Sequence, residues 1–167
     1  DVCDLEALRQ AIHDAEKIWD QQLAGVFHLA GEGNLEHHWK VMDEHWVVSE
    51  TRQTFEWMFR PKVYGSWSLH QLIKDRPDAL FVLFSSVNSI FGGATFSAYS
   101  AANSFLDNYV FHLRNTTHAR SYCFNWTMWD ETGMSEGNPQ FARESARNTG
   151  FFIMSKEHAL NSLIAGL

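Results

Sequence analysis

The sequence predicts an α/β fold with a doubly wound parallel sheet, and three observations support this prediction. The stretch "ALFVLFSS" at 79–86 is a continuous apolar run with the length of a buried parallel strand. Two further short apolar runs, at 24–31 and 121–126, also read as strands. Segments with helical spacing, ten or more residues long, separate the three runs. Strands that alternate with such helices pair in parallel through crossover connections and form a layered sheet.

The first part of the chain predicts helices on either side of the strand at 24–31. Asp4 is suited to cap a helix that runs to about Gln22. Helical spacing returns after the strand, and Ser49 precedes another helix. The apolar positions of these two later segments are Leu35, Trp39, Met42, Trp46, Phe55, Met58 and Phe59.

Pro61 is expected to break or restart the helical run, because proline cannot donate a backbone hydrogen bond. A new helix then extends from about Lys62 to Lys74 and stops at the "DRPD" turn before the strand at 79–86. Beyond this strand we expect a loop through Gly92-Gly93 and a long helix from about Phe96 to Arg114.

After the strand at 121–126, loop signals fill 130–140 and a short helix is expected at 140–148. Ser155 is suited to cap a terminal helix. The residues expected to face inward from that helix are Ala159, Leu160, Leu163 and Ile164.

The count of strands indicates an incomplete sheet. About three are recognisable, whereas a doubly wound dinucleotide-binding sheet has about six. We therefore expect residues 1–167 to be one partial domain, the C-terminal portion of a Rossmann-like fold. The glycine-rich cofactor turn is missing: Gly31-Glu-Gly33 has no third glycine, and Gly92-Gly93 precedes a loop instead of opening a helix.

Composition excludes several classes of partner. The net charge of −7 and the pI near 5.6 argue against binding to nucleic acid or anionic lipid. No apolar run reaches the roughly 18 residues of a membrane span, and the chain opens without a signal peptide. Cys3 and Cys123 have no metal or redox spacing and suit a reducing compartment. We therefore expect a cytoplasmic location.

Four polar residues are spaced so that the fold could unite them. Tyr99 can donate a proton if a nearby cation lowers its pKa from the usual value of about 10. Asn103 follows Tyr99 by one helical turn, so both side chains share a face. Ser86 ends the preceding strand, and Lys62 supplies a cation. This set suits reduction of a ketone, which needs a proton donor and stabilisation of the developing charge on oxygen.

The motifs around these residues are "FRPKVYGSWSLHQL", "LFVLFSSV", "YSAANSFLD" and "FNWTMW". Together they resemble the ketoreductase domain of modular polyketide and nonribosomal peptide synthetases, in the short-chain dehydrogenase/reductase superfamily. The match extends from the Asp-Val pair at the start to the closing helix. Ordinary members of the superfamily place lysine four residues after tyrosine and asparagine on the preceding helix. Synthetase ketoreductases exchange the two, as this sequence does with Lys62 and Asn103.

The resemblance implies a role for each of these residues. Tyr99 would be the proton donor and Ser86 would hold the carbonyl oxygen. Lys62 would lower the tyrosine pKa and sustain a proton relay with Asn103.

The resemblance also implies NADPH as the cofactor and a partner that presents the substrate. Asp1 would meet the adenine, and "HLAG" at 28–31 would lie behind the cofactor. The implied cofactor-binding residues are Asp1, Val2, Ala30, Gly31, Lys62, Tyr99 and Trp126. The substrate would be a keto group on an acyl thioester, carried by the phosphopantetheine arm of an acyl or peptidyl carrier protein. Other implied partners are the N-terminal half of the reductase domain and neighbouring synthetase domains.

The chain departs from the family in ways that leave substrate and stereochemistry open. The family's Trp-Gly-Pro-Trp reads Trp126-Thr-Met-Trp129. The Leu-Asp-Asp of one stereochemical class is missing after Gly31, and Phe91 stands where the other class often has tryptophan. The stretch between Gly31 and Lys62 is longer than usual and resembles ketoreductases of depsipeptide synthetases, which reduce α-keto acyl groups. Reduction of β-ketoacyl groups is the alternative.

Two other interpretations of the whole chain stay open at this point. One is a non-catalytic, reductase-like scaffold for domain docking, which retention of all four polar residues opposes. The other is a different short-chain enzyme, such as an epimerase or dehydratase, which Asn103 opposes because these enzymes normally have lysine there.

Two local alternatives concern a metal site and the choice between two serines. His37, His38 and His45 lack a metal-binding spacing and an identifiable third ligand, so no metal site is expected. Ser85 adjoins Ser86, and neighbours on a strand face opposite ways, so only one can point at Tyr99. The family spacing favours Ser86.

Overall fold

Three parallel strands form one sheet in the order β1-β2-β3. The strands are β1 (Gly25–His28), β2 (Leu80–Ser86) and β3 (Arg120–Trp126). His28 pairs with Leu83 and Ser86 pairs with Trp126, so β2 and β3 end at the same level. The structure is a computed structural model that describes residues 1–31, 46–93, 96–130, 132–133 and 139–167. Within them, the predicted parallel α/β architecture is confirmed.

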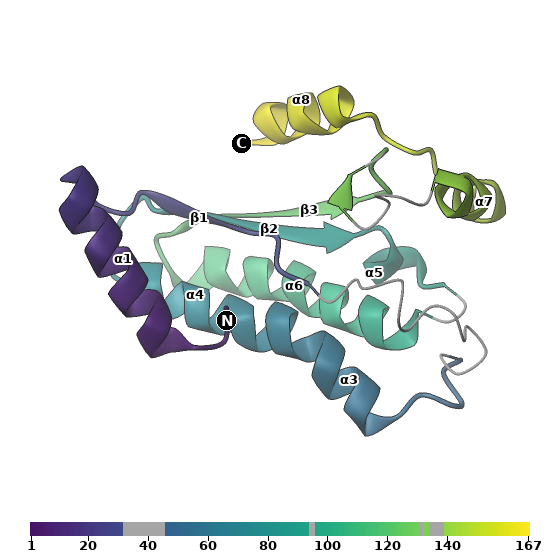
Figure 1. The fold of residues 1–167 in the computed structure, drawn as a ribbon, viewed down its shortest axis with the longest axis horizontal. Coiled ribbons are helices and arrows are strands. Elements are labelled where there is room, and N and C mark those ends of the chain that lie inside the picture. Colours follow the sequence, from purple (N-terminus) through teal and green to yellow (C-terminus); the bar gives the residue numbers. More distant parts are fainter. Residues whose placement is uncertain (32–45, 94–95, 131, 134–138) are drawn as a thin grey trace.

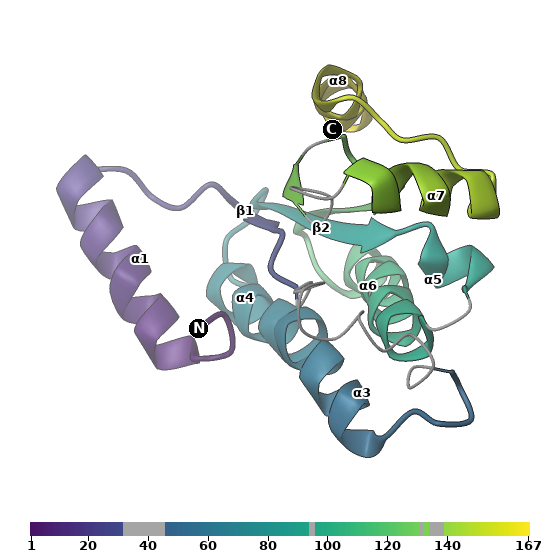
Figure 2. The ribbon, with the colours of Figure 1, turned by 45° about the vertical axis from the view of Figure 1, so that its right-hand side comes forward.

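Helices lie on both faces of the sheet (Figure 1). α4 (Gly65–Ile73) and α6 (Ser97–Thr116) cover one face, and α8 (Lys156–Gly166) lies over the other. The remaining helices are α1 (Leu5–Trp19), α3 (Arg52–Phe59), α5 (Asn88–Phe91) and α7 (Pro139–Thr149). In both views β2 points towards α5, and Figure 2 shows α3 and α4 following one another along the same side of the sheet as α6.

The main core lies between the sheet and the helices α4 and α6. Its side chains are apolar and at most 8% exposed: Leu69, Ile73, Ala79, Phe81, Leu83, Leu106, Val110 and Leu113. Burial of a side chain the size of Phe81 or Ile73 contributes roughly 1.5–3 kcal/mol. Because α6 supplies three of these residues, the core fixes the helix that carries Tyr99 against β2.

Between β1 and β2, the residues from Arg52 to Ile73 form a helical stretch without a break, and this corrects the prediction at Pro61. α3 continues directly into a π-helical segment, η2 (Arg60–Tyr64), and then into α4. Pro61 lies in the first turn of η2, where the wider π turn accommodates its missing N–H. Proline therefore changes the type of helix here and does not end it.

The predicted helix caps agree with the structure in two of three places. Asp4 accepts a hydrogen bond from the Ala7 N–H, and Ser155 accepts one from the His158 N–H. α1 ends three residues before the predicted Gln22, because Asp20 adopts the left-handed conformation with φ 49°. The helix after Ser49 begins at Arg52, and Thr51 caps it.

The face that α8 turns inward was predicted only in part. Ala159 is fully buried and Leu163 is partly buried, whereas Leu160 and Ile164 are 50% and 72% exposed. Gly166 sets this orientation, because a Cβ there would lie 2.6 Å from the Phe124 ring. Residues 159, 163 and 166 share one helix face, which excludes the other two apolar positions from the interface.

Two further comparisons concern segments between the strands. The expected loop after Ser86 contains the short helix α5, which ends at Gly92. The predicted helical positions Leu35, Trp39 and Met42 lie outside the described residues. Among the helices that the structure describes, none is long and apolar enough to span a bilayer.

Gly65 is expected to stabilise the fold because it has no side chain. A Cβ at Gly65 would lie 2.8 Å from Val2 Cγ1, although alanine has the higher helix propensity by about 1 kcal/mol. We expect Gly65→Ala to lower stability by roughly 1–3 kcal/mol through overpacking. Urea unfolding followed by circular dichroism measures the change. The pair Gly65→Ala with Val2→Ala should recover part of the loss, and stabilisation by Gly65→Ala alone would contradict this packing.

Candidate active site

Lys62, Ser86, Tyr99 and Asn103 come together where β2 ends beside η2 and α6. Lys62 is only 8% exposed, and its Nζ donates a hydrogen bond to the Phe84 carbonyl at 3.1 Å. The same Nζ lies 6.0 Å from the centroid of the Tyr99 ring. The structure therefore places a buried cation next to the phenol, although the two residues are far apart in the sequence.

The Tyr99 phenol is protonated at neutral pH. Burial raises its pKa, and hydrogen bonding by the Ser86 and Asn103 side chains offsets part of this rise. The sequence had predicted a pKa lowered by Lys62, but in this chain the loss of hydration has the larger effect. A protonated phenol that contacts a serine hydroxyl can donate a proton to an oxygen placed between them.

The two neighbouring serines have different partners. The Ser85 hydroxyl donates to the backbone carbonyl of Asn103 at 3.2 Å, which ties β2 to α6. The Ser86 Oγ accepts a hydrogen bond from the Asn88 N–H at 3.2 Å and lies beside the Tyr99 phenol. Only Ser86 thus presents its hydroxyl to Tyr99.

Asn103 is fully buried one turn after Tyr99. Its Nδ2 donates to the Tyr99 carbonyl at 2.9 Å, which fixes the orientation of the amide. Its Oδ1 has no hydrogen-bond partner among the described residues. A buried acceptor of this kind costs about 1–3 kcal/mol when unsatisfied, so it is suited to a water or ligand donor in the site.

His28 and the π turn place Lys62. The His28 side chain is buried at the end of β1, and its Nε2 donates to the Pro61 carbonyl at 3.0 Å. Burial, then the charge of Lys62, lower the pKa of His28 to about 4, so this ring is neutral. A neutral imidazole can lie beside Lys62 without repelling it. The link holds the residue before Lys62 against the sheet.

The charge of Lys62 is maintained against its surroundings. Burial lowers the pKa of Lys62 to about 8, and Cys123 and Asp107 act in the opposite direction. Burial also raises the pKa of the Cys123 thiol far above neutral, so the thiol carries no charge there. Among the described groups, Asp107 is thus the acid whose negative charge favours the ammonium form of Lys62.

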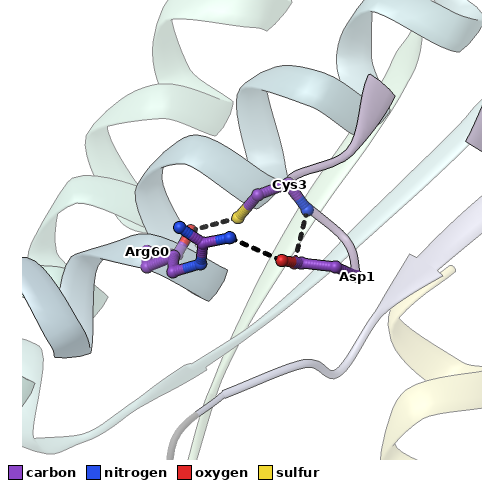
Figure 3. Close-up of polar contacts among 3 residues, drawn as sticks. All are labelled: Asp1, Cys3 and Arg60. Carbon is purple, nitrogen blue, oxygen red and sulfur yellow. Dashed lines mark hydrogen bonds and ion pairs between the residues drawn. The ribbon is translucent and has the colours of Figure 1, made fainter. Parts of the chain in front are cut away.

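Asp1 contacts the beginning of η2 and not the four clustered residues. Its Oδ2 forms an ion pair with Arg60 Nη2 at 2.6 Å, and its Oδ1 accepts from the Cys3 N–H at 2.9 Å (Figure 3). The Cys3 thiol donates to the Arg60 carbonyl at 3.0 Å. The segment predicted to meet the adenine is therefore attached to the helix turn that carries Lys62.

The other predicted cofactor residues occupy different positions. Val2 packs against the main core and against Gly65. Ala30 and Gly31 follow β1 and are exposed, and a Cβ at Gly31 would lie 3.6 Å from Lys62 Nζ. Trp126 ends β3 opposite Ser86. Ala30, Gly31 and Trp126 thus lie at the carboxyl ends of the strands, where parallel α/β sheets bind ligands.

Trp126 and its neighbour leave two polar atoms available at this edge. The Trp126 ring stacks on Phe124 at 5.3 Å and packs against Phe84 and Trp129. Within the described part of the chain, Trp126 Nε1 and Thr127 Oγ1 are buried without a hydrogen-bond partner. The end of β3 can therefore still form hydrogen bonds with a polar group of a ligand.

Sequence reasoning missed Asp107, which continues the face formed by Tyr99 and Asn103. The three residues are spaced by four along α6, which was a usable signal. The Asp107 carboxylate accepts hydrogen bonds from Ser89, Asn125 and Cys123.

His37, His38 and His45, for which no metal site was predicted, lie outside the described residues. No group of three potential metal ligands occurs among the residues that are described.

The KR domain model matches residues 1–131 of the chain. The polyketide synthase GfsA of Streptomyces halstedii is 34% identical over 170 residues, covering 100% of this chain and 2% of that protein. Mycoketide-CoA synthase of Mycobacterium tuberculosis is 31% identical over 166 residues, covering 96% of this chain and 4% of that protein. The chain therefore spans a small fraction of the relatives that it matches.

Solved structures give the same assignment. An A-type ketoreductase from a modular polyketide synthase has a TM-score of 0.82 and 30% identity, covering 98% of this chain and 32% of that one. A keto acid-selecting NRPS module with adenylation, ketoreductase and pseudo Asub domains has a TM-score of 0.80 and 29% identity, covering 99% and 13%. The predicted family and its Rossmann-like fold are confirmed: the chain belongs to the KR domains of modular polyketide and nonribosomal peptide synthetases.

Proposed function

We propose that this chain is the catalytic portion of an NADPH-dependent ketoreductase that reduces a keto group on a carrier-bound acyl thioester within a modular synthetase. The observation that carries the proposal is the buried Lys62 ammonium, 6.0 Å from the Tyr99 ring. A scaffold used only for docking has no need to bury a cation beside a phenol. The KR relatives support the same activity.

Each of the four residues has a role in the proposed reaction. The Ser86 hydroxyl holds the substrate carbonyl oxygen, and Tyr99 transfers its phenolic proton to that oxygen as charge develops there. Lys62 stabilises the tyrosinate that this transfer leaves behind. Asn103 Oδ1, which has no hydrogen-bond partner among the described residues, can orient a water that returns a proton towards Lys62 and Tyr99.

The residues at the strand ends fit a nicotinamide cofactor. This group would supply a hydride ion, which consists of one proton and two electrons, to the carbonyl carbon. Thr127 Oγ1 and Trp126 Nε1 can bind its carboxamide, because both are buried without a partner in the described chain. Gly31 leaves space beside Lys62, and Lys62 and Tyr99 would contact the ribose side of the group. Ala30, Asp1 and Val2 complete the proposed cofactor-binding set.

We propose that the phosphate site and the groups that select NADPH belong to a part of the fold outside the three strands described here. We propose that residues 1–167 form one portion of a reductase domain, with the glycine-rich turn on another segment. The helix N-terminus that binds a pyrophosphate would come from that segment.

The acyl group is proposed to be an α-keto acyl group, with a β-ketoacyl group as the second candidate. The likeness to the ketoreductase of a keto acid-selecting module supports the first, and the polyketide synthase relatives support the second. Both would reach the site as thioesters on the phosphopantetheine arm of a carrier protein. Neighbouring synthetase domains would bring that carrier to Ser86 and Tyr99.

Tyr99→Phe in the full-length protein should abolish NADPH-dependent reduction of an acyl pantetheine thioester, because no phenolic proton is left. NADPH binding, measured by fluorescence titration, should change little. Tyr109→Phe on the same helix is the matched control and should retain turnover. Undiminished reduction by Tyr99→Phe would refute the mechanism and favour the scaffold.

Lys62→Met should abolish reduction and stabilise the fold at neutral pH. The pKa of Lys62 falls from 10.5 in the unfolded chain to about 8 in the folded chain, so protonation of Lys62 opposes folding below pH 8. We expect the free energy of unfolding to rise by about 1–3 kcal/mol at pH 7. This range allows for the lost hydrogen bond to the Phe84 carbonyl. The gain should fade between pH 8 and 10.5, where the wild-type lysine is no longer charged when folded.

Urea unfolding at pH 7 and pH 10 measures this difference, with Lys74→Met as a control at an exposed lysine. A loss of stability for Lys62→Met that is equal at both pH values would show that Lys62 acts only through packing.

The isolated 167-residue chain should bind NADPH weakly, because the proposed phosphate site lies on another segment. Fluorescence titration of NADPH into the chain, after circular dichroism has verified folding, tests this expectation. A polypeptide that also contains the proposed phosphate-binding segment is the comparison and should bind tightly. Tight binding by the isolated chain would mean that these residues contain their own phosphate site.

A further inference from the structure

The Asp107 carboxylate connects three elements that surround the site. Its Oδ2 accepts from the Ser89 hydroxyl at 2.5 Å and from Asn125 Nδ2 at 2.9 Å. Its Oδ1 accepts from the Cys123 thiol at 3.2 Å. The donors come from α5 and β3, while Asp107 itself is on α6. One side chain therefore links the helix of Tyr99 to both segments that adjoin Ser86.

The donors of this network also contact each other and the chain at Ser86. Asn125 Nδ2 approaches the Ser89 hydroxyl at 2.8 Å and the Ser86 carbonyl at 3.4 Å. Ser89 follows Ser86 by three residues, and the Ser86 Oγ already accepts from the first N–H of α5. The position of α5, and with it the orientation of Ser86, therefore depends on how α5 is held to α6.

Asp107 also acts on Lys62 through its charge. The titratable groups that face Lys62 are His28 from β1, Cys123 from β3, and Tyr99 and Asp107 from α6. His28, Cys123 and Tyr99 are neutral at pH 7, because burial disfavours the charged form of each. Among the described groups that face Lys62, Asp107 is thus the one that favours the ammonium form.

We propose that Asp107 is a positioning residue of the ketoreductase site, which links α5 and β3 to α6 and so holds Ser86 in register with Tyr99. This inference rests on the proposed function. Hydrogen bonds to an ionised acceptor are about twice as strong as neutral ones, so the carboxylate makes a firmer link between α5, α6 and β3 than an amide would. The same negative charge reaches Lys62 through the weakly polar interior. Asp107 acts through other residues and does not touch the substrate.

Three variants of the full-length protein separate the positioning of Ser86 from the effect of the Asp107 charge on Lys62. Asp107→Asn keeps the shape but removes the charge. Ser89→Ala removes the shortest hydrogen bond and leaves the charge in place. Asp78→Asn makes the same chemical change at an exposed residue just before β2 begins, and the length of β2, roughly 20 Å, separates it from Ser86.

The pH dependence of kcat/KM with an acyl pantetheine thioester is the main measurement. Activity should fall as Lys62 loses its proton, at about pH 8 in the wild type. Asp107→Asn should move this alkaline limb down by roughly half to one pH unit, because Lys62 loses the charge that favours its proton. It should also lower kcat about tenfold with little change in KM, since Ser86 shifts from the reacting oxygen.

The controls should respond differently. Ser89→Ala should lower kcat but leave the alkaline limb at the wild-type pH, and Asp78→Asn should change neither value. Loss of activity by Asp107→Asn with an unmoved limb, or equal limbs in all variants, would overturn the electrostatic part of the proposal. Unchanged kcat in both Asp107→Asn and Ser89→Ala would overturn the positioning part.

A measurement that needs no activity separates this proposal from the proposed function. NMR of ¹³Cε-labelled lysine follows the protonation of Lys62 directly, with Lys62→Met to assign the signal. A lower Lys62 pKa in Asp107→Asn than in the wild type supports the electrostatic link even if no ketone is reduced. An unchanged Lys62 pKa refutes it even if the wild type is an active ketoreductase.

Discussion

The burial of the Lys62 ammonium is the constraint on which the site depends. An isolated charge in a protein interior is unfavourable by several kcal/mol unless its surroundings compensate. Here the compensation comes from the Phe84 carbonyl, the Asp107 carboxylate and the facing Tyr99 ring. Each of these groups belongs to a strand or helix that the main core holds in place. The lysine is thus unfavourable to bury, and the polar groups around it compensate for that burial.

The α/β architecture could be predicted because it follows from local patterns. The apolar run at 79–86 and the helical spacing at 96–114 correspond closely to β2 and α6. Asp4 and Ser155 cap helices because their side chains accept from the backbone nearby, an interaction that sequence spacing fixes. Pro61 and the inward face of α8 could not be predicted in the same way. The first depends on a π turn, and the second depends on contact between Gly166 and Phe124.

The candidate site was predictable where its residues belong to recognisable motifs. Lys62, Ser86, Tyr99 and Asn103 meet as expected, because η2, β2 and α6 pack side by side. The direction of the Tyr99 pKa was not predictable, since it depends on how deeply the phenol is buried. The partners of Asp107 could not be read from spacing either, because Ser89, Cys123 and Asn125 reach it across the sheet. The ion pair between Asp1 and Arg60 could not be predicted either, because the two residues are far apart in the sequence.

The π turn at Arg60–Tyr64 has a consequence for the organisation of the core. A π turn acts as one extra residue in an α-helix, so it rotates everything that follows by about 100°. Met58 before the turn packs with Ala98 and Ala102, whereas Leu69 and Ile73 after it pack in the main core. One helical line therefore serves two hydrophobic clusters with different faces. Lys62 lies in the π turn between these two sets of residues, so its polar side chain belongs to neither cluster.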